Sequence, residues 1–273
     1  MQQGYKKFIL LFILYLSAFF RRRRWVRHCR LNFSGPWDAA GSLELIDVSI
    51  QVDKLVSDTD PLVLWAVGAN GNALCRQGVT TRNPVGDGWI HVPTALDKPF
   101  KSISVGGSFR LWGVASDGSA WYRAGITCQN PAGSRWLQVV PPPSGNAVLH
   151  QVSVGESAVW AVDTTDNLWR RENVTYSFPE GTGWVQVASC VKQVSVGPSD
   201  QVYIVAKSGF GRGKHAGVVY KRAGITETKP SGNEWKTVIG HEWAHVSVRG
   251  NHEQWKPQVL LSMMIAQKGS IPV

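Results

Sequence analysis

The sequence is poor in cysteine, methionine and charge. Its 273 residues include four cysteines and three methionines, and charged side chains make up 18%. The cysteines form no C-x-x-C pair, and their spacings of 46, 53 and 62 residues match no zinc framework. A chain of this length does not need disulfides to fold. We therefore expect free thiols, as in a reducing compartment, at Cys29, Cys75, Cys128 and Cys190.

The longest hydrophobic stretch near the N-terminus is too short to span a membrane as a helix. It runs over 13 residues, Phe8 to Phe20, whereas a spanning helix needs about 20. It has the length of a signal-peptide core, but four arginines follow where a small-residue cleavage site would stand. Residues 1–20 are therefore either a signal anchor, a buried strand, or a segment outside the folded unit.

Acidic residues are missing from the first 30 positions, which hold eight of the 29 lysines and arginines. The other 243 residues carry 29 − 8 = 21 basic and 19 acidic side chains, a net charge of +2. The overall charge of +10 is thus a property of the N-terminus. The remainder lacks the basic surface that nucleic-acid binding requires, so we predict no nucleic-acid partner.

Tryptophan and glycine are abundant instead, with 13 and 28 residues. They mark a repeat: LWAVGANGNALCRQGV, LWGVASDGSAWYRAGI, VWAVDTTDNLWRRENV and VYIVAKSG…GVVYKRAGI align. The anchor aromatics are Trp65, Trp112, Trp160 and Tyr203, spaced 47, 48 and 43 residues apart. A second tryptophan closes each copy after a Gly/Pro-rich loop, at Trp89, Trp136, Trp184 and Trp235.

Each copy reads as four short antiparallel strands. Apolar residues alternate with a period of two. The tight turn between the second and third strands holds Asn-Gly, Asp-Gly and Asp-Asn in the first three copies, and eight extra residues lengthen it in the fourth. A repeat of about 45 residues with four strands is typical of a propeller blade. The anchor and closing tryptophans are expected to pack between neighbouring blades, since one blade cannot bury both faces. Stacking on sugar rings is the alternative role for them.

The recurring pattern W-x-V … R-x-G-I/V … P-x-G-x-x-W-x-x-V … V-S-V-G resembles the tectonin β-propeller repeat, over residues 45–250. The resemblance implies an all-β propeller. The repeats supply four complete blades and a fifth inner strand at Val246-Ser247-Val248. Because tectonin propellers usually have more blades, we expect an incomplete propeller that either forms an open arc or needs other chain segments to close. The family includes secreted lectins and large intracellular proteins that act in autophagy. A tail follows over residues 251–273.

The N-terminal flank resembles the intracellular branch of the family. RRRRWVR is similar to the closing motif of a dysferlin domain, in which arginines and tryptophans stack on each other. Residues 21–36 therefore represent the tail of such a domain, and residues 1–20 do not resemble its missing part. A possible membrane contact is assigned to Arg21, Arg22, Arg23, Arg24, Trp25 and Arg27.

Two motifs resemble a catalytic or phosphate-binding signature, but we interpret both as parts of the repeat structure. His241 to His245, HEWAH, matches the zinc-peptidase pattern, but the repeat places Trp243 and His245 on or entering a strand. Residues four apart on a strand lie about 13 Å apart along the chain, too far to share one zinc ion. Gly209 to His215, GFGRGKH, departs from a phosphate loop and reads as a hairpin extension. A flexible solvated loop is its default interpretation, and a partner contact is the alternative for Arg212, Lys214 and His215.

We therefore predict a protein that is not an enzyme and binds no cofactor or metal. By resemblance it is an interaction scaffold for protein partners in autophagosome–lysosome tethering, cytoplasmic and peripheral on those membranes. The alternative is a secreted or signal-anchored lectin, in which case the propeller binds glycans.

Overall fold

The computed structural model describes residues 44–51, 61–80, 82–145, 147–240 and 242–248. The predictions for residues 1–36 and 251–273 lie outside these ranges. The described chain forms four separate antiparallel sheets of four strands each, in simple sequence order. The predicted all-β fold with four four-stranded blades is therefore confirmed.

Each sheet is one copy of the repeat. The first contains β1 (Leu45–Gln51), β2 (Val63–Gly68), β3 (Ala73–Gln77) and β4 (Gly88–Val92). The second contains β5 (Phe100–Val105), β6 (Leu111–Ala115), β7 (Ala120–Ala124) and β8 (Arg135–Gln138). The third contains β9 (Leu149–Val154), β10 (Val159–Asp163), β11 (Leu168–Arg171) and β12 (Trp184–Ala188). The fourth contains β13 (Val191–Val196), β14 (Val202–Ala206), β15 (Val219–Ala223) and β16 (Glu234–Ile239). Three 3-10 turns lie between strands: Ala95–Asp97, Gly107–Phe109 and Phe210–Arg212.

The hairpin between the second and third strands depends on residues that accept a left-handed backbone. Gly71 has φ +82° and Gly118 has φ +86°. The third copy has no glycine there, and Asp166 adopts φ 69° instead. Aspartate tolerates this region better than most residues because its short polar side chain can bond locally.

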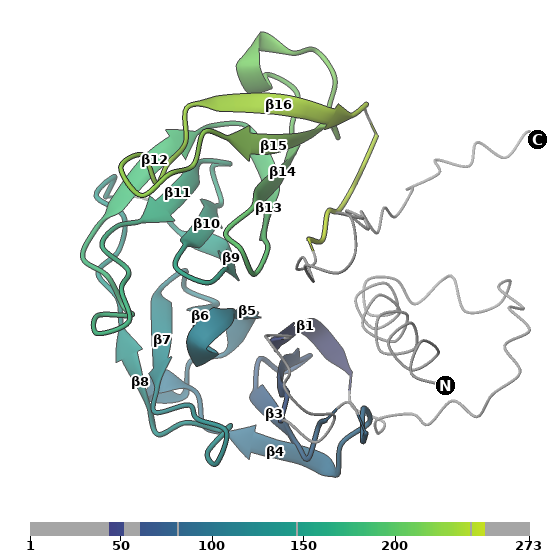
Figure 1. Cartoon of the computed structure of the whole chain (residues 1–273), viewed down its shortest axis with the longest axis vertical. Coiled ribbons are helices and arrows are strands. Elements are labelled where there is room, and N and C mark those ends of the chain that lie inside the picture. The colour runs from purple at the N-terminus through teal and green to yellow at the C-terminus, as the bar shows by residue number, and fades with distance from the viewer. Residues whose placement is uncertain (1–43, 52–60, 81, 146, 241, 249–273) are drawn as a thin grey trace, which may run out of the picture.

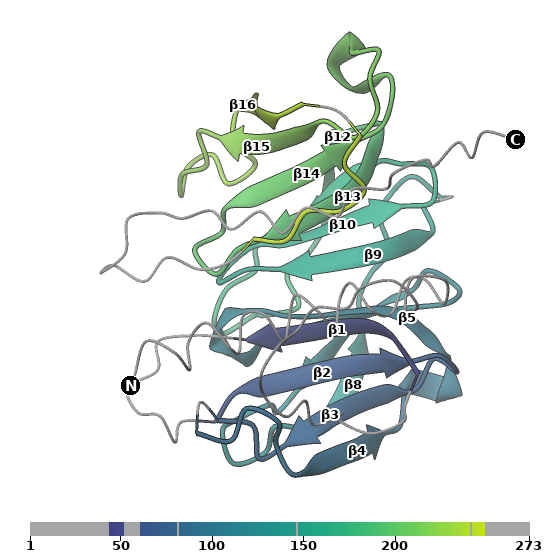
Figure 2. The same ribbon diagram turned by 90° about the vertical axis from the view of Figure 1, so that its right-hand side faces the viewer.

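The four sheets follow one another around an open arc (Figure 1). The first strand of each sheet lies at the centre of the arc, so that β1 packs beside β5, β5 beside β9 and β9 beside β13. Figure 2 shows these inner strands in succession along the long axis of the molecule. The arc does not close between the first and the fourth sheet.

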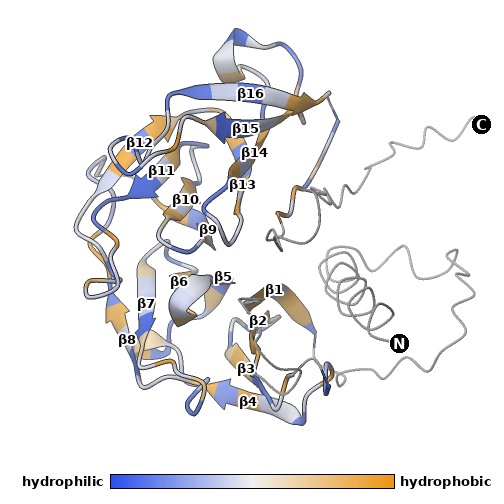
Figure 3. Cartoon of the chain, viewed as in Figure 1, coloured by the Kyte–Doolittle hydropathy of each residue, from blue (hydrophilic) through white to orange (hydrophobic). Residues whose placement is uncertain are grey.

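Apolar side chains fill the junctions between sheets, and Figure 3 shows hydrophobic residues along the strands of every sheet. Trp65, Trp112 and Trp160 are each 0% exposed. Each packs with residues of the following sheet, as Trp65 does with Phe100 and Ile103. Tyr203 takes this place in the fourth copy and packs with Val246. The anchor aromatics thus face the next blade along the chain.

A polar ladder joins the inner strands. At every junction, two side chains of one inner strand accept hydrogen bonds from two backbone N–H groups of the next inner segment, at 2.8–3.4 Å. The accepting and donating residues are Asp47 and Ser49 with Ile103 and Val105, Ser102 and Ser104 with Val152 and Val154, Gln151 and Ser153 with Val194 and Val196, and Gln193 and Ser195 with Val246 and Val248. Serines of the inner strands therefore help to hold one blade to the next at every junction.

The predicted fifth inner strand takes its expected place without being a strand. Residues 244–248 have no assigned β-structure. Their N–H groups at Val246 and Val248 nevertheless bond to Gln193 and Ser195, as those of an inner strand do. The reason is the kind of bond: a strand is defined by backbone-to-backbone pairing, and this segment is held by side chains.

Candidate interaction surfaces

An arginine stacks on the closing tryptophan within every blade. The guanidinium carbon lies 4.7–5.4 Å from the ring centroid, within the range of a cation–π contact. The four pairs are Arg76 with Trp89, Arg123 with Trp136, Arg171 with Trp184, and Arg222 with Trp235. The repeat pattern contains these arginines, but the pattern alone did not predict that they stack on the closing tryptophans.

The same arginines hold the loop that precedes the closing tryptophan. Each Nε donates to a backbone oxygen nine residues further on, at 2.6–2.9 Å. Burial lowers the pKa of all four guanidinium groups, and that of Arg171 falls to about 10 even though Glu180 and Glu172 oppose the shift. Their Nε groups are thus engaged inside the blade. We assign these bonds to the scaffold.

Two of the closing tryptophans contact the anchor tryptophan of the preceding blade. The rings of Trp136 and Trp65 lie 6.2 Å apart, and those of Trp184 and Trp112 lie 6.0 Å apart, both edge to face. The indole N–H of Trp184 also donates to the Val140 carbonyl at 2.8 Å. Trp184 is 6% exposed, and Trp89, Trp136 and Trp235 are partly buried. Every tryptophan in the described part of the chain is at least partly buried.

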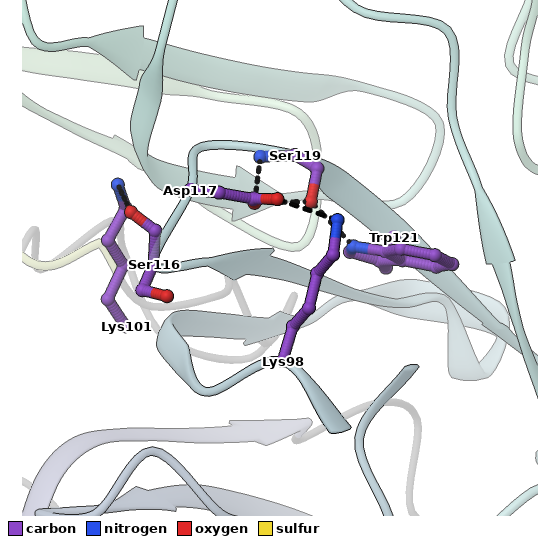
Figure 4. A network of polar contacts seen from close by, with 6 residues as sticks. All are labelled: Lys98, Lys101, Ser116, Asp117, Ser119 and Trp121. Atoms are coloured by element: carbon purple, nitrogen blue, oxygen red, sulfur yellow. Dashed lines mark hydrogen bonds and ion pairs between the residues drawn. The ribbon is translucent and has the colours of Figure 1, made fainter. Parts of the chain in front are cut away.

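A polar network surrounds the β6–β7 hairpin of the second blade (Figure 4). Lys98 Nζ lies 2.7 Å from an oxygen of Asp117, and the backbone and hydroxyl of Ser119 donate to the other oxygen at 2.9 and 2.6 Å. The hydrogen bond from Lys98 is the main cause that lowers the pKa of Asp117 to about 2. Lys101 donates to the backbone oxygen of Ser116.

The network contains the polar side chains and the tryptophan that a sugar-binding site would need, but the tryptophan ring is not accessible to a sugar. The Ser119 hydroxyl accepts a bond from the Trp121 indole at 2.9 Å, and Lys98 lies over the ring (Figure 4). Trp121 is only 5% exposed, so its face is not open to a sugar ring. The network ties the hairpin to the entry of β5 and leaves an exposed Lys98–Asp117 pair at the surface.

The hairpin extension of the fourth blade packs against the blade through Phe210. Phe210 is 7% exposed and packs against Tyr220 and Trp235, at centroid distances of 4.9 and 5.8 Å. Arg212, Lys214 and His215 are exposed on the same extension. The extension therefore presents these three side chains from a fixed base.

The HEWAH motif lies partly outside the described residues, because His241 does. Glu242 to Val248 contains no helix, and Trp243 lies in an isolated bridge. Within the described ranges, no group of three or more His, Cys, Asp or Glu residues could hold a metal ion. The basic motif Arg21 to Arg27 also lies outside these ranges. No helix among the described residues is long and apolar enough to cross a membrane.

The described cysteines are unpaired and differ in access. Cys75 is buried, Cys190 is partly buried and Cys128 is exposed. Burial raises the pKa of the Cys75 thiol to about 12. Cys29 lies outside the described residues.

The sequence analysis did not single out one exposed aromatic, Tyr176, which is 86% exposed in the loop before Trp184. Phe178 is 43% exposed beside it in sequence. Alignment of the four loops places Tyr176 where the other copies have Thr81, Cys128 and Glu227. That comparison would have identified it as the large aromatic at this loop position.

Comparison with known proteins identifies the repeat. A family model described as "Tectonin domain" matches residues 95–256, and one described as "Propeller" matches residues 63–92. Tectonin beta-propeller repeat-containing protein 1 of Gallus gallus is 53% identical over 240 residues, covering 88% of this chain and 20% of that protein. The Homo sapiens protein of the same name is 54% identical over 241 residues, covering 86% and 20%. This chain thus spans about a fifth of the length of these curated relatives.

Among solved structures, "YCF48 bound to D1 peptide" aligns over 75% of this chain and 58% of that chain. Its TM-score is 0.44 and its sequence identity is 14%.

Proposed function

Because the chain belongs to the tectonin family of β-propeller repeats, we propose that it is an interaction scaffold without catalytic activity. We further propose that it acts in the tethering of autophagosomes to lysosomes, where it contacts proteins of that machinery. It would then be cytoplasmic and peripheral on those membranes. The extensive similarity to tectonin beta-propeller repeat-containing protein 1 supports the family branch on which this proposal rests.

The scaffold proposal is supported by one structural observation. In each blade, arginine and tryptophan, the side chains best suited to binding a ligand, are used in contacts within the protein. The repeated arginines and tryptophans bind each other and the closing loops, which gives a rigid frame. The loop tips and hairpins remain exposed, among them Arg212 and Lys214. Rigid frames with variable exposed loops are suited to protein binding.

The proposed membrane contact is the basic motif Arg21 to Arg27. Attraction to an anionic membrane contributes about 1 kcal/mol per basic residue near the surface. We expect the chain to float with vesicles containing phosphatidylserine, and a variant with Arg→Gln at positions 21–24 and 27 to bind at least about tenfold more weakly. An Arg→Lys variant at the same positions keeps the charge and serves as the control. Equal binding of the Gln variant would contradict the membrane contact.

The autophagy role is tested in cells that lack the gene. We expect non-acidified autophagosomes to accumulate and the fraction that fuses with lysosomes to fall. Re-expression of the chain within its own full-length protein should restore fusion, whereas a version lacking the four blades should not. Normal fusion in the deleted cells would overturn this proposal.

A lectin is the alternative function, and Tyr176 is the observation that favours it. Its ring is exposed, as a sugar-stacking aromatic must be. The scaffold proposal predicts no sugar-competable binding on a glycan array. Reproducible glycan binding that disappears in Tyr176→Ala, with an unchanged melting temperature, would replace the scaffold with the lectin.

A further inference from the structure

Arg110 is a buried arginine with unpaired hydrogen-bond donors. It stands directly before β6 in the second blade and is 5% exposed. Its Nε and Nη1 atoms are buried and find no hydrogen-bond acceptor among the residues that the structure describes. Buried charges in proteins are normally paired, because an unpaired charge away from water is unfavourable. The guanidinium group is therefore placed to bind an acceptor that the described blades do not supply.

The Arg110 side chain lies on the face of the second blade that packs against the third blade. Leu111 belongs to the core between the first and second blades, whereas Trp112 packs with residues of the third. Arg110 has extended backbone angles, φ −73° and ψ 114°, so the alternation of the strand continues through it. Arg110 and Trp112 therefore share one face, at the junction in the middle of the arc (Figure 1).

Two further donors lie on the same face as Arg110. Tyr122 lies opposite Trp112 in register, with ring centroids 6.2 Å apart. Burial raises the pKa of Tyr122, the Glu180 carboxylate raises it further, and the Arg110 guanidinium lowers it. The hydroxyl of Tyr122 therefore lies near the Arg110 charge. The Trp112 indole N–H is also buried without an acceptor in the described part of the chain.

The repeat does not require an arginine at this position. In the other three blades, the residue two positions before the anchor aromatic is uncharged: Val63, Ala158 and Gln201. Val63 packs in one apolar cluster with Ile126, and Ala158 packs against the cluster that includes Trp160. Trp160 also has an indole N–H without an acceptor within the described ranges, so that feature alone does not define a site. The arginine distinguishes the junction of the second and third blades from the others.

No acidic side chain pairs with Arg110 in the described blades. None of the ion pairs between described residues includes Arg110 or Glu180. Glu180 nevertheless lies close enough to raise the pKa of Tyr122. Glu156, in the loop between β9 and β10 of the third blade, accepts a bond from the Ser108 hydroxyl at 2.8 Å instead. The positive charge of Arg110 is thus left for a ligand.

We propose that the junction of the second and third blades binds an oxyanion such as phosphate on the Arg110 guanidinium, with the Tyr122 hydroxyl as a second donor. An oxyanion offers only acceptors to these donors, whereas a water molecule brings hydrogens that need acceptors of their own. Tyr122 is partly exposed, so the oxyanion reaches the site from the surface. Both sheets of the junction have all four strands, so the site consists of residues of this chain alone. The site goes beyond the proposed role in autophagy and does not depend on it.

Inorganic phosphate is the probe, and the thermal unfolding midpoint of the 273-residue chain is the readout, with sodium chloride keeping the ionic strength constant. We expect phosphate at tenfold excess over its dissociation constant to raise the midpoint by about 3–6 °C. Arg110→Met should abolish this rise. Without phosphate, the midpoint of Arg110→Met should equal or exceed that of the parent, because the change removes an unpaired buried charge and keeps a side chain of similar length.

Matched variants separate this site from positive charge in general. Arg135 is exposed on β8 of the same blade, and Arg135→Met should keep the rise with phosphate. Tyr122→Phe removes only the hydroxyl and should weaken phosphate binding about three- to tenfold. No rise in the parent, or an equal rise in Arg110→Met, would overturn the proposal. An equal loss in Arg135→Met would do the same, because phosphate would then respond to overall charge.

A phosphoserine peptide distinguishes the two sources of the oxyanion. If the peptide raises the midpoint at concentrations about tenfold below those of inorganic phosphate, and only with Arg110 present, the site takes a phosphate group carried by a protein. If inorganic phosphate alone does so, the site takes a free ion. A double-mutant cycle tests an internal occupant instead. If Arg110→Met and Glu180→Gln have strongly non-additive effects on the phosphate-free midpoint, Glu180 pairs with Arg110 in solution, and the proposal is wrong.

Discussion

Trp136 closes the second blade, yet its ring packs edge-on against Trp65 of the first, with centroids 6.2 Å apart and planes at 77°. The Arg123 guanidinium lies 5.2 Å from the centre of the same Trp136 ring. One closing tryptophan therefore joins an arginine of its own blade to the anchor of the preceding blade. Trp184 repeats this with Arg171 and Trp112. At these two junctions, aromatic contacts between blades are reinforced by a buried arginine.

Replacement of an anchor tryptophan should therefore destabilise two blades at once. Trp112 is 0% exposed and contacts Tyr122 and Trp184. We expect Trp112→Ala to lower the free energy of unfolding by about 3–5 kcal/mol because it leaves a large cavity. Tyr176→Ala removes an aromatic ring that is 86% exposed and is the control, expected within about 0.5 kcal/mol of the parent. Thermal and denaturant unfolding measure both. An unchanged midpoint for Trp112→Ala would remove that residue from the core.

The buried carboxylate of Asp163 should make stability depend on acid. Asp163 is 0% exposed and accepts bonds from Thr165, Asn167 and Trp169. Burial alone would raise its pKa, but these bonds outweigh burial and the pKa lies below its ordinary value. A lowered folded-state pKa gives stability that is present above the unfolded value, near 3.9, and is lost as pH falls through the folded value.

We therefore expect Asp163→Asn to cost about 1–3 kcal/mol at pH 7 and to flatten the decline of stability below about pH 4. Denaturant midpoints at pH 7 and pH 3 measure this. Asp166→Asn on the same hairpin is the control, because Asp166 forms an exposed ion pair with Lys207. Identical pH profiles for Asp163→Asn and the parent would contradict the assignment.

The reactivity of each cysteine thiol should depend on its exposure to solvent. Cys75 is buried with its pKa raised to about 12, whereas Cys128 is exposed. Because the thiolate is the reactive form, iodoacetamide at pH 7.5 should modify Cys128 and spare Cys75 in the folded chain. Mass spectrometry of the peptides measures the two rates, and both cysteines should react in 8 M urea. Similar native rates would show that the first blade opens readily.

Zinc content tests the interpretation of HEWAH. Glu242 to Val248 contains no helix, so His245 does not lie on the helical turn that lets the two histidines of an H-E-x-x-H motif share one zinc ion. We expect the purified chain to hold no stoichiometric zinc by elemental analysis. One zinc ion per chain that is lost in His241→Ala would contradict this.

Repetition explains how much could be predicted from the sequence. Four copies with the same turn residues and tryptophans determine the strands, because each copy supports the interpretation of the others. The ladder could not be predicted, since Ser49 and Val105 are 56 residues apart and a serine in an alternating segment looks like an ordinary half-exposed residue.

The ladder between inner strands has a consequence for how the arc assembles. Its bonds run from hydroxyl, amide or carboxylate side chains to plain backbone N–H groups, so they do not distinguish one blade from another. The ladder alone would therefore form at a wrong junction too, so chain connectivity and the different apolar side chains packed at each junction must set the order of the blades. Because the ladder bonds use backbone N–H groups at every junction, whole copies can be gained or lost without breaking the ladder between the remaining blades. The number of blades in such a protein is thus easy to change, whereas a one-residue slip within a blade is not.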